Sequence, residues 1–277
     1  MGWWAVDVRG EAARRDALAA WLVARTGQAV EQRDDGTLIT FAEDETSADA
    51  LIAGLATSPD PSATAARRAL VPVDWTTHWR DGLGARRLGR LVVRPSWIPP
   101  DLRPGEVEVV LDPEMAFGSG EHGSTRAALA MLVRLIRPGD QVLDLGSGSG
   151  ILSIAAVRLG AARATGIEVD AEANHVARRN AVQNGVQSTC EFLDGDAGAL
   201  APLLGPADLI LSNILRTANL ELLPAVTSAL RPGGLVVFSG MEEGEAPLFR
   251  PSLTAAGFAT ELETTDAGWW AVAARRP

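Results

Sequence analysis

The sequence predicts an α/β protein in which a large, doubly wound domain follows a small α+β domain, and three observations carry this prediction. The chain has 277 residues, about two domains at roughly 150 residues each. In its second half, apolar runs of strand length alternate regularly with runs of helical spacing, as in a parallel doubly wound sheet. Four prolines fall within residues 95–105, where they favour an extended connector. We therefore predict a small domain over 1–94, a linker over 95–105 and a large domain over 106–277.

The small domain is predicted from short apolar runs and helical spacings that alternate between turn signals. Asp35-Gly36 lies between two such runs and is a hairpin signal. Gly27 is suited to end the first helix, and Ser47 is suited to cap the second. The predicted strands are 3–8, 29–32, 37–41, 69–73 and 88–93. The predicted helices are 11–26, 47–56 and 74–83, the last with Trp75 and Trp79 on one face.

The large domain shows the more regular alternation, which is typical of βαβ units in a parallel sheet. Its predicted strands are 141–145, 164–168, 189–193, 209–212, 234–239, 260–265 and 269–273. Its predicted helices are 124–137, 151–159, 171–183, 219–230 and 246–256.

Composition excludes several classes of protein. The formal net charge of −10 argues against a direct nucleic-acid partner. No apolar run reaches the ~18–20 residues of a membrane span, and no signal peptide is recognised, so no membrane partner is expected. The single cysteine, Cys190, fits a reducing cytoplasm. Three histidines without ligand spacing predict no protein-bound metal. All 25 basic residues are Arg, and Lys and Tyr are both absent, as GC-rich coding favours.

The acidity is concentrated after the predicted linker. Residues 1–104 carry 13 Arg and 14 acidic residues, for a net charge of −1, whereas residues 105–277 carry 12 and 21, for a net charge of −9. A cationic target is therefore expected to be attracted to the large domain.

The strongest motif is a glycine-rich loop after the first strand of the large domain. Gly146, Gly148 and Gly150 let the backbone turn tightly and approach a ligand closely. A dinucleotide-binding loop has the pattern G-x-G-x-x-G, but Ile151 stands where its third glycine belongs. The pattern G-x-G-x-G after Asp144 suits an adenosyl group with a cationic amino-acid tail, whose ammonium Asp144 can attract.

Polar residues also end the next three strands, where ligands bind in open α/β sheets. Glu168 is placed to accept the ribose hydroxyls, although an acid here can also begin a helix. Asp196 suits either an adenine contact or a solvated turn. Asn213 can orient an attacking amine through its side-chain oxygen, although an Asn at a strand end can also serve as a cap.

Residues 112–126 precede the first helix of the large domain and hold further candidates. Phe117 is placed to cover the cofactor, and Thr125 is placed to cap the helix or touch the ligand. His122 beside Glu121 resembles a catalytic dyad, but without a G-x-S-x-G motif or a metal partner we favour a structural role. Five tryptophans, for which packing ranks ahead of substrate contact, are Trp75, Trp79, Trp97, Trp269 and Trp270.

Several of these segments together resemble the ribosomal protein L-11 methyltransferase family (PrmA type). The resemblance runs from about Asp74 to the C-terminus, and the segments that carry it are 112–125, 144–150, Glu168 and 213–215. It implies a class I methyltransferase sheet, mostly parallel with an antiparallel last strand, after a ferredoxin-like substrate-recognition domain. The chain departs from the family pattern with Ser124-Thr125 for Thr-Thr, Glu168 for the commoner Asp, and Arg80 for Lys.

The resemblance implies a function: methyl transfer from S-adenosylmethionine to lysine side-chain and/or N-terminal amines of ribosomal protein L-11. By the same analogy Thr125, Gly146, Glu168 and Asn213 contact the cofactor. Three alternatives stay open: a related methyltransferase acting on another protein lysine or a small molecule, an NAD-dependent oxidoreductase, and a non-catalytic binding protein. Binding of NAD rather than S-adenosylmethionine would favour the oxidoreductase.

Overall fold

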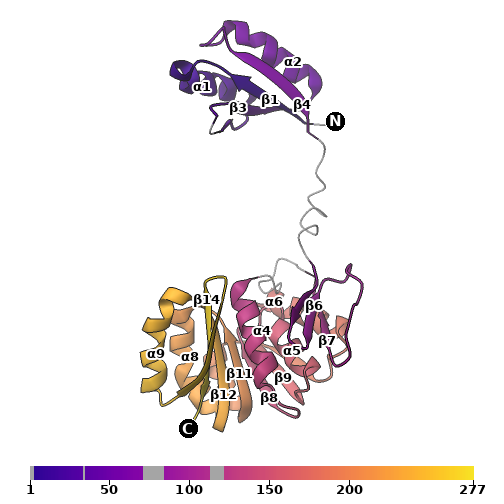
Figure 1. Cartoon of the computed structure of the whole chain (residues 1–277), viewed down its shortest axis with the longest axis vertical. Helices are drawn as coiled ribbons and strands as arrows, with labels where there is room; N and C mark the ends of the chain where they lie inside the picture. The colour runs from indigo at the N-terminus through magenta and orange to yellow at the C-terminus, as the bar shows by residue number, and fades with distance from the viewer. Residues whose placement is uncertain (1–2, 34, 71–83, 113–121) are drawn as a thin grey trace. The chain divides into compact units, whose positions relative to one another are not determined.

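The computed structural model describes residues 3–33, 35–70, 84–112 and 122–277. By its internal contacts the chain divides into two compact units, Met1–Gly82 and Leu83–Pro277 (Figure 1). The predicted helix over 74–83, with Trp75, His78 and Trp79, lies outside the described residues, as does Phe117.

The N-terminal unit is a βαββαβ sandwich. Its four strands form one antiparallel sheet in the order β2-β3-β1-β4. Leu18 and Leu22 of the first helix and Leu51 of the second pack with Val6 and Val8 of the central strand, so both helices cover one face of the sheet. This is the predicted ferredoxin-like arrangement. The bounds are β1 Trp4–Arg9, α1 Arg15–Thr26, β2 Glu31–Gln32, β3 Leu38–Ala42, α2 Glu45–Gly54 and β4 Thr64–Ala69.

Two local predictions in this unit need correction. Helix α2 is capped by Asp44, whose Oδ1 accepts a hydrogen bond from the backbone N–H of Ser47 at 2.7 Å, so the helix begins earlier than predicted. A carboxylate is a strong N-cap acceptor, and Ser47 lies inside the first turn. A strand that was not predicted covers Thr64–Ala69, and most of the strand predicted over 69–73 lies outside the described residues. The stop at Gly27 is confirmed, because this glycine ends α1 with φ +65°.

The C-terminal unit is built on a seven-stranded sheet in the order β10-β9-β8-β11-β12-β14-β13. Every strand pair is parallel except those made by β14, which is antiparallel to both neighbours. The predicted class I methyltransferase sheet is thereby confirmed. The strands are β8 Gln141–Leu145, β9 Arg163–Glu168, β10 Cys190–Asp194, β11 Ala207–Asn213, β12 Leu230–Glu242, β13 Ala259–Asp266 and β14 Trp269–Arg275.

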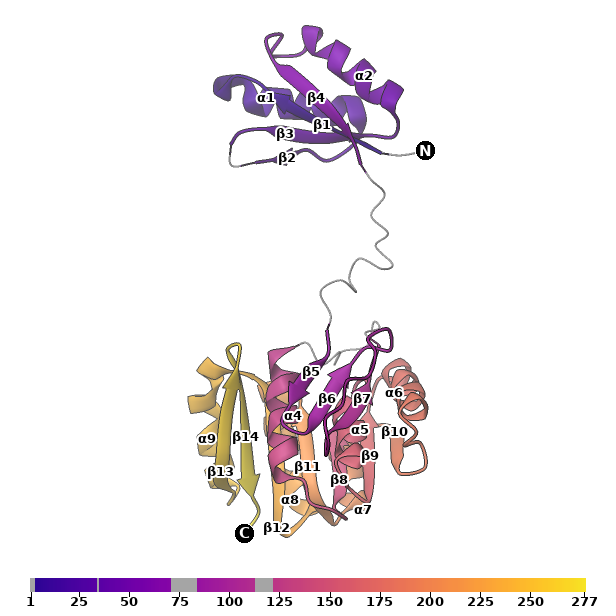
Figure 2. The ribbon, with the colours of Figure 1, turned by 45° about the vertical axis from the view of Figure 1, so that its right-hand side comes forward.

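Helices cover both faces of this sheet (Figure 2). One apolar core joins the sheet to α4, α5 and α6, and a second joins it to α7, α8 and α9. Both faces are buried, which explains the near-continuous apolar runs of the strands. The helices are α4 Gly123–Leu135, α5 Ile151–Arg158, α6 Ala171–Gln183, α7 Ala197–Leu204, α8 Arg216–Ala229 and α9 Ala246–Ala255; α7 was not predicted.

The proline-rich segment is not the connection between the two units. Strands β5 Arg86–Leu88, β6 Leu91–Arg94 and β7 Val107–Val110 form a second, three-stranded sheet, in which β6 and β7 are parallel. Residues 95–106 cross over between them. Leu91 and Val109 are fully buried in the core of the C-terminal unit, so the predicted boundary at 95–105 is corrected to one between Gly82 and Leu83.

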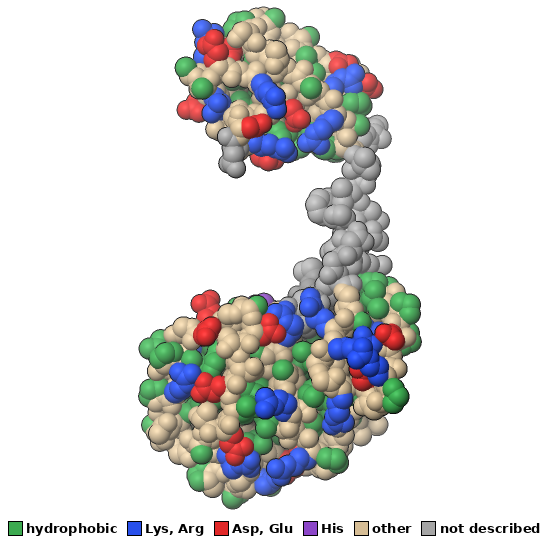
Figure 3. Space-filling model, in the orientation of Figure 1, with side chains coloured by type: hydrophobic (Ala, Val, Ile, Leu, Met, Phe, Trp, Pro, Cys, Tyr) green, Lys and Arg blue, Asp and Glu red, His purple; other side chains and the backbone are tan. Residues whose placement is uncertain are grey.

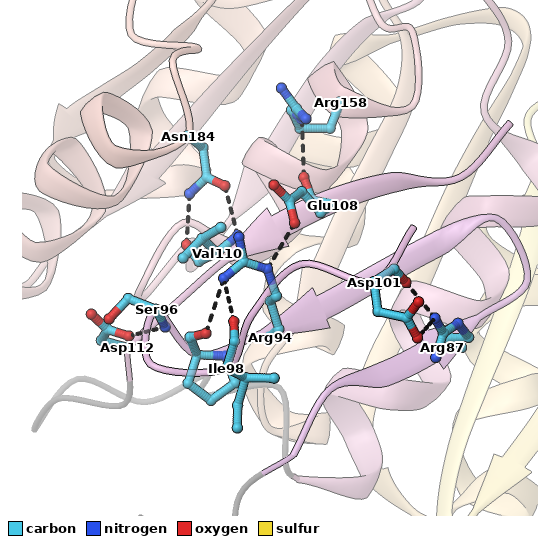
Figure 4. Close-up of polar contacts among 11 residues, drawn as sticks. Arg87, Arg94, Ser96, Ile98, Asp101, Glu108, Val110, Asp112, Arg158 and Asn184 are labelled. Atoms are coloured by element: carbon cyan, nitrogen blue, oxygen red, sulfur yellow. Dashed lines mark hydrogen bonds and ion pairs between the residues drawn. The ribbon is translucent and has the colours of Figure 1, made fainter. Parts of the chain in front are cut away.

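Figure 4 shows how this crossover is held. The guanidinium of Arg94, itself 9% exposed, donates to Glu108 Oε2 and to the carbonyl of Ile98, both at 2.7 Å. The backbone N–H of Ser96 donates to Asp112 Oδ1 at 2.6 Å. A buried charge paired in this way holds a loop firmly, because breaking the pair leaves the other partner uncompensated. The prolines therefore stiffen a loop inside one unit.

The corrected boundary removes the predicted charge contrast. Residues 1–82 carry 8 Arg and 13 acidic residues, and residues 83–277 carry 17 and 22, so each part has a net charge of −5. In Figure 3 both units present arginines interspersed with acidic side chains on the face shown. The acidity is therefore a property of the whole chain.

Candidate functional site

The glycine-rich loop connects the end of β8 to the start of α5 at the carboxyl edge of the sheet. Gly146, Gly148 and Gly150 have φ values of +71°, +52° and +79°, which L-residues with side chains rarely adopt. A Cβ on Gly146 would lie 2.5 Å from the side chain of Ile214. The loop is also tied to β9, because the N–H groups of Gly146 and Ser147 both donate to the carbonyl of Ile167. The loop therefore packs closely between β9 and the segment that follows β11.

Asp144 is a fully buried carboxylate with only one oxygen bonded. Its Oδ2 accepts from the backbone N–H and the hydroxyl of Ser153, at 3.1 and 2.7 Å. Its Oδ1 is buried and has no hydrogen-bond partner among the described residues. Burial raises the pKa of Asp144 to about 6, with a smaller contribution from the nearby charge of Glu168. A buried carboxylate with only one hydrogen-bonded oxygen destabilises the folded protein. A cationic group at this site would therefore stabilise it.

The stability of the protein without cofactor is expected to fall as the pH rises through the pKa of Asp144. The folded-state pKa lies above the unfolded value, so the contribution is fully present below pH ~4 and is lost as the pH rises through about 6. Asp144→Asn removes this titration. Urea unfolding of both proteins should show wild type losing about 1–2 kcal/mol relative to the variant between pH 5 and pH 7.5. A difference that is constant with pH would contradict the assignment.

Glu168 connects the end of β9 to the glycine-rich loop. Its Oε2 accepts from the N–H of Gly148 at 3.0 Å, and its Oε1 accepts from the N–H groups of Val169 and Asp170 at 2.8 and 3.1 Å. The carboxylate therefore lies beside the glycine-rich loop and helps to fix the loop's conformation. Asp170, as expected for a helix-starting acid, caps α6 by accepting from the N–H of Glu172.

Asp196 serves as the N-cap of α7, where its Oδ1 accepts from the N–H of Ala199 at 2.9 Å. Sequence reasoning missed its neighbour Asn174, which is fully buried. The amide of Asn174 donates to the carbonyls of Glu168 and Leu193 and to Asp194 Oδ1, and so ties together the ends of β9 and β10. The available signal was a polar residue on the otherwise buried face of a helix.

Asn213 ends β11, and its Nδ2 donates to Oγ1 of Thr125 at 3.3 Å. Thr125 is fully buried in the first turn of α4. The Oδ1 of Asn213 is buried and has no partner among the described residues. This oxygen is an unused acceptor at the same edge of the sheet as the glycine-rich loop, because β8 and β11 are neighbours. Such an acceptor can hold the N–H of an incoming amine.

The side chain of His122 packs against neighbouring side chains, as expected for a structural role. Its Nδ1 lies 2.8 Å from the hydroxyl of Ser124, and its ring centroid lies 4.2 Å from that of Trp269 at an interplanar angle of 59°. Next to it, Arg126 makes two hydrogen bonds to Asp266 and lowers the pKa of that carboxyl. These contacts join the start of α4 to the β13–β14 hairpin.

The structure thus brings most of the predicted site residues to one edge of the sheet. These residues are Thr125, Asp144, Gly146, Gly148, Gly150, Glu168 and Asn213. Asp196 follows β10 beside them and caps its own helix, and Phe117 lies outside the described residues. Two carboxylates, a glycine-rich turn and an amide oxygen without a partner among the described residues lie at this edge. Together they can bind a ligand that has a cationic end and a hydroxylated ring, and they can accept the N–H of an amine.

Comparison with known proteins shows which family the whole chain resembles. A family model described as ribosomal protein L11 methyltransferase matches residues 8–277. A ribosomal protein L11 methyltransferase of Pelotomaculum thermopropionicum is 38% identical over 218 residues, covering 78% of this chain and 70% of that protein. One from Thermus thermophilus is 39% identical, covering 71% and 75%. The crystal structure of a ribosomal protein L11 methylase from Lactobacillus delbrueckii subsp. bulgaricus is 30% identical with a TM-score of 0.64, covering 70% of this chain and all of that one.

Proposed function

Because the chain belongs to the ribosomal protein L11 methyltransferase family, whose members use S-adenosylmethionine as the methyl donor, we propose that it methylates lysine side-chain and/or N-terminal amines of ribosomal protein L11. The observation that carries this proposal is the buried, unpartnered Oδ1 of Asn213 beside the glycine-rich loop. It supplies an acceptor for an amine next to a site suited to the donor. The N-terminal unit is proposed to recognise the protein substrate, and the cytoplasm, where ribosomal proteins are made, is its proposed location.

The described residues fit the proposed cofactor. The Oδ1 of Asp144, which has no partner among the described residues, would accept its ammonium, directly or through the loop. The glycines at 146, 148 and 150 give the loop the positive φ angles of its tight turn. Glu168 would accept the ribose hydroxyls, exchanging some of its present backbone bonds, and Asp196 would lie near the adenine. Thr125 and Phe117, the second of which lies outside the described residues, are proposed as further contacts of the cofactor. When bound, the cofactor supplies a methyl group already activated on a sulfonium.

The protein's own contribution is alignment and desolvation. Asn213 Oδ1 would accept an N–H of the neutral amine and so would orient the lone pair of the amine toward the side of the site that holds the cofactor. A free Lys amine has a pKa of ~10.4 and an α-amine ~7.7–8.0, so the proton must leave first. Partial desolvation lowers a Lys pKa. No strong general base is proposed, since His122 packs against Ser124 and Trp269.

The function is tested by incubating the protein with a labelled methyl donor and purified ribosomal proteins, followed by mass mapping of the label. The expected result is label on amines of ribosomal protein L11. Label on a lysine of another protein would mean that the chain has the proposed methyltransferase activity but a different protein substrate. Binding of NAD with no binding of S-adenosylmethionine would favour an oxidoreductase, and cofactor binding without transfer to any acceptor would favour a binding protein. Because the chain has no Lys, its own side chains add no background.

Methyl transfer to a Lys-rich target is expected to slow as the salt concentration rises. The whole chain carries a net charge of −10, which favours encounter with a cationic partner, and added salt screens charges beyond a Debye length of ~10 Å at 0.1 M. The measurement is kcat/KM for the protein acceptor from about 0.05 to 0.5 M NaCl. A short neutral peptide acceptor is the control, since its rate should change little. An equal response of both acceptors would remove the electrostatic argument.

A further inference from the structure

A network of buried polar side chains lies directly behind Asn213. The hydroxyl of Ser212 donates to Asn219 Oδ1 at 2.7 Å. The Nδ2 of Asn219 donates to the carbonyls of Ile214 and Ser239, each at 3.0 Å. The hydroxyl of Ser239 in turn donates to the carbonyl of Ser124 at 2.9 Å. The three polar side chains involved, those of Ser212, Asn219 and Ser239, are at most 1% exposed.

This network joins four elements around the proposed methyl-transfer site: β11, α8, β12 and α4. Ser212 and Ile214 flank Asn213 at the end of β11, Asn219 lies in α8, and Ser239 lies in β12 where its pairing with β14 shifts register. Ser124 directly precedes Thr125, the partner of Asn213. Asn219 therefore contacts the residues on both sides of Asn213 and, through Ser239, the turn of α4 that carries Thr125.

Few hydrogen bonds hold the side chain of Asn213 in place. Among the described residues its side chain makes one hydrogen bond, to Thr125 at 3.3 Å, and its Oδ1 has no partner there. A side chain held by so few bonds takes its direction mainly from its backbone. The amide of Asn219 has both a bonded oxygen and two bonded N–H groups, and a fully satisfied buried network of this kind rigidifies the backbone around it.

We propose that Asn219 is a positioning residue for methyl transfer: by bonding Ser212 and the Ile214 and Ser239 carbonyls, it fixes the direction in which Asn213 Oδ1 meets the acceptor amine. This inference rests on the proposed function. Because the reacting atoms must be aligned closely, a displacement of ~1 Å in a residue that orients a reactant is enough to slow the reaction strongly. Binding of cofactor and acceptor, which depends on many other contacts, changes little.

The chain offers a matched control in Asn184, which Figure 4 shows beside Val110. Like Asn219 it is buried and makes three side-chain hydrogen bonds, two to Val110 and one to the carbonyl of Asn180, but it lies at the end of α6 against β7. Asn219→Ala and Asn184→Ala therefore both remove a buried amide with three bonds. Comparable losses of stability are expected from the two substitutions.

The first readout is kinetic. In Asn219→Ala, kcat is expected to fall about 10- to 50-fold, while the acceptor KM and the cofactor Kd stay within about threefold. In Asn184→Ala, kcat should stay within about twofold of wild type. Equal kcat values for the two variants would overturn the inference. If Asn219→Ala does not fold, Ser239→Ala, which removes only the bond to the Ser124 carbonyl, should lower kcat by about two- to fivefold.

The second readout needs no turnover and so separates this inference from the proposed function. Selective ¹⁵N labelling of asparagine gives only five side-chain amide signals, each assignable by substitution, from Asn174, Asn180, Asn184, Asn213 and Asn219. The Asn213 signal is expected to move in Asn219→Ala or Ser239→Ala and to stay in place in Asn184→Ala. An unmoved Asn213 signal overturns the inference whatever the substrate. A moved signal in a protein that transfers no methyl to ribosomal protein L11 refutes the proposed substrate alone.

Discussion

Asn213→Ala is expected to lower kcat for methyl transfer by about 100-fold or more, the largest effect of any single substitution at the site. The substitution removes the unpartnered Oδ1, the only acceptor that we assign to the incoming amine. Without it the lone pair of the amine is no longer directed at the methyl carbon, and a reaction that depends on alignment loses most of its advantage over solution. The measurement is single-turnover methyl transfer at saturating cofactor and acceptor.

Calorimetric titration with S-adenosylmethionine is the companion measurement for Asn213→Ala. The cofactor Kd should change by less than about threefold, because Asp144, Glu168 and the glycine-rich loop are untouched. Wild-type turnover in this variant would remove Asn213 from the mechanism. A loss of cofactor affinity as large as the loss of kcat would assign Asn213 to cofactor binding instead, a role that the family resemblance also allows.

Gly240→Ala is expected to destabilise the protein by about 3 kcal/mol or more. Gly240 has φ +82°, and a Cβ there would lie 2.3 Å from the carbonyl oxygen of Ile214 and 2.7 Å from its backbone N and C. The obstruction is backbone, so no side-chain rotation relieves it. The segment after Asn213 would have to shift, and kcat should fall as well. The measurement is urea or thermal unfolding.

Gly233→Ala is the matched control for this substitution. Gly233 lies in the same strand, β12, with φ +71°, and a Cβ there would meet only the side chain of Arg231, at 3.8 Å. Both variants therefore share the cost of a left-handed alanine, ~1–2 kcal/mol. The difference between them isolates the close approach of Gly240 to Ile214, expected at about 1–3 kcal/mol. Equal destabilisation would show that this contact relaxes freely.

The gathering of the candidate site residues at one edge of the sheet could be predicted because its signals are local. Asp144, the three glycines and Glu168 stand at strand ends marked by apolar runs, and the glycines occupy backbone conformations that other residues avoid. Helix α7 was missed because it is short and contains Pro202. The hairpin of β5 and β6 was predicted as one strand, although Gly89, with φ +59°, marks the turn inside it.

Other features were beyond sequence reasoning because they depend on contacts between distant residues. The prolines of residues 95–105 correctly indicate an extended connection, but they do not reveal that both of its ends belong to the same unit. That depends on β6 pairing with β7 and on Leu91 entering the core. The Asn219 network likewise joins residues of α8, β11, β12 and α4, and Ser239 and Ser124 are 115 positions apart.

The β5–β6–β7 sheet also decides where a catalytic module can be separated from this chain. A fragment that begins at Glu106 would lack β5 and β6 and would leave β7 as a single strand without its partner. It would also expose apolar residues of the core to which Leu91 and Val93 belong. Unpaired strand edges and uncovered apolar patches promote association between chains. A segment transferred in a domain graft or swap should therefore start before Arg86, so that β5, β6 and β7 stay together.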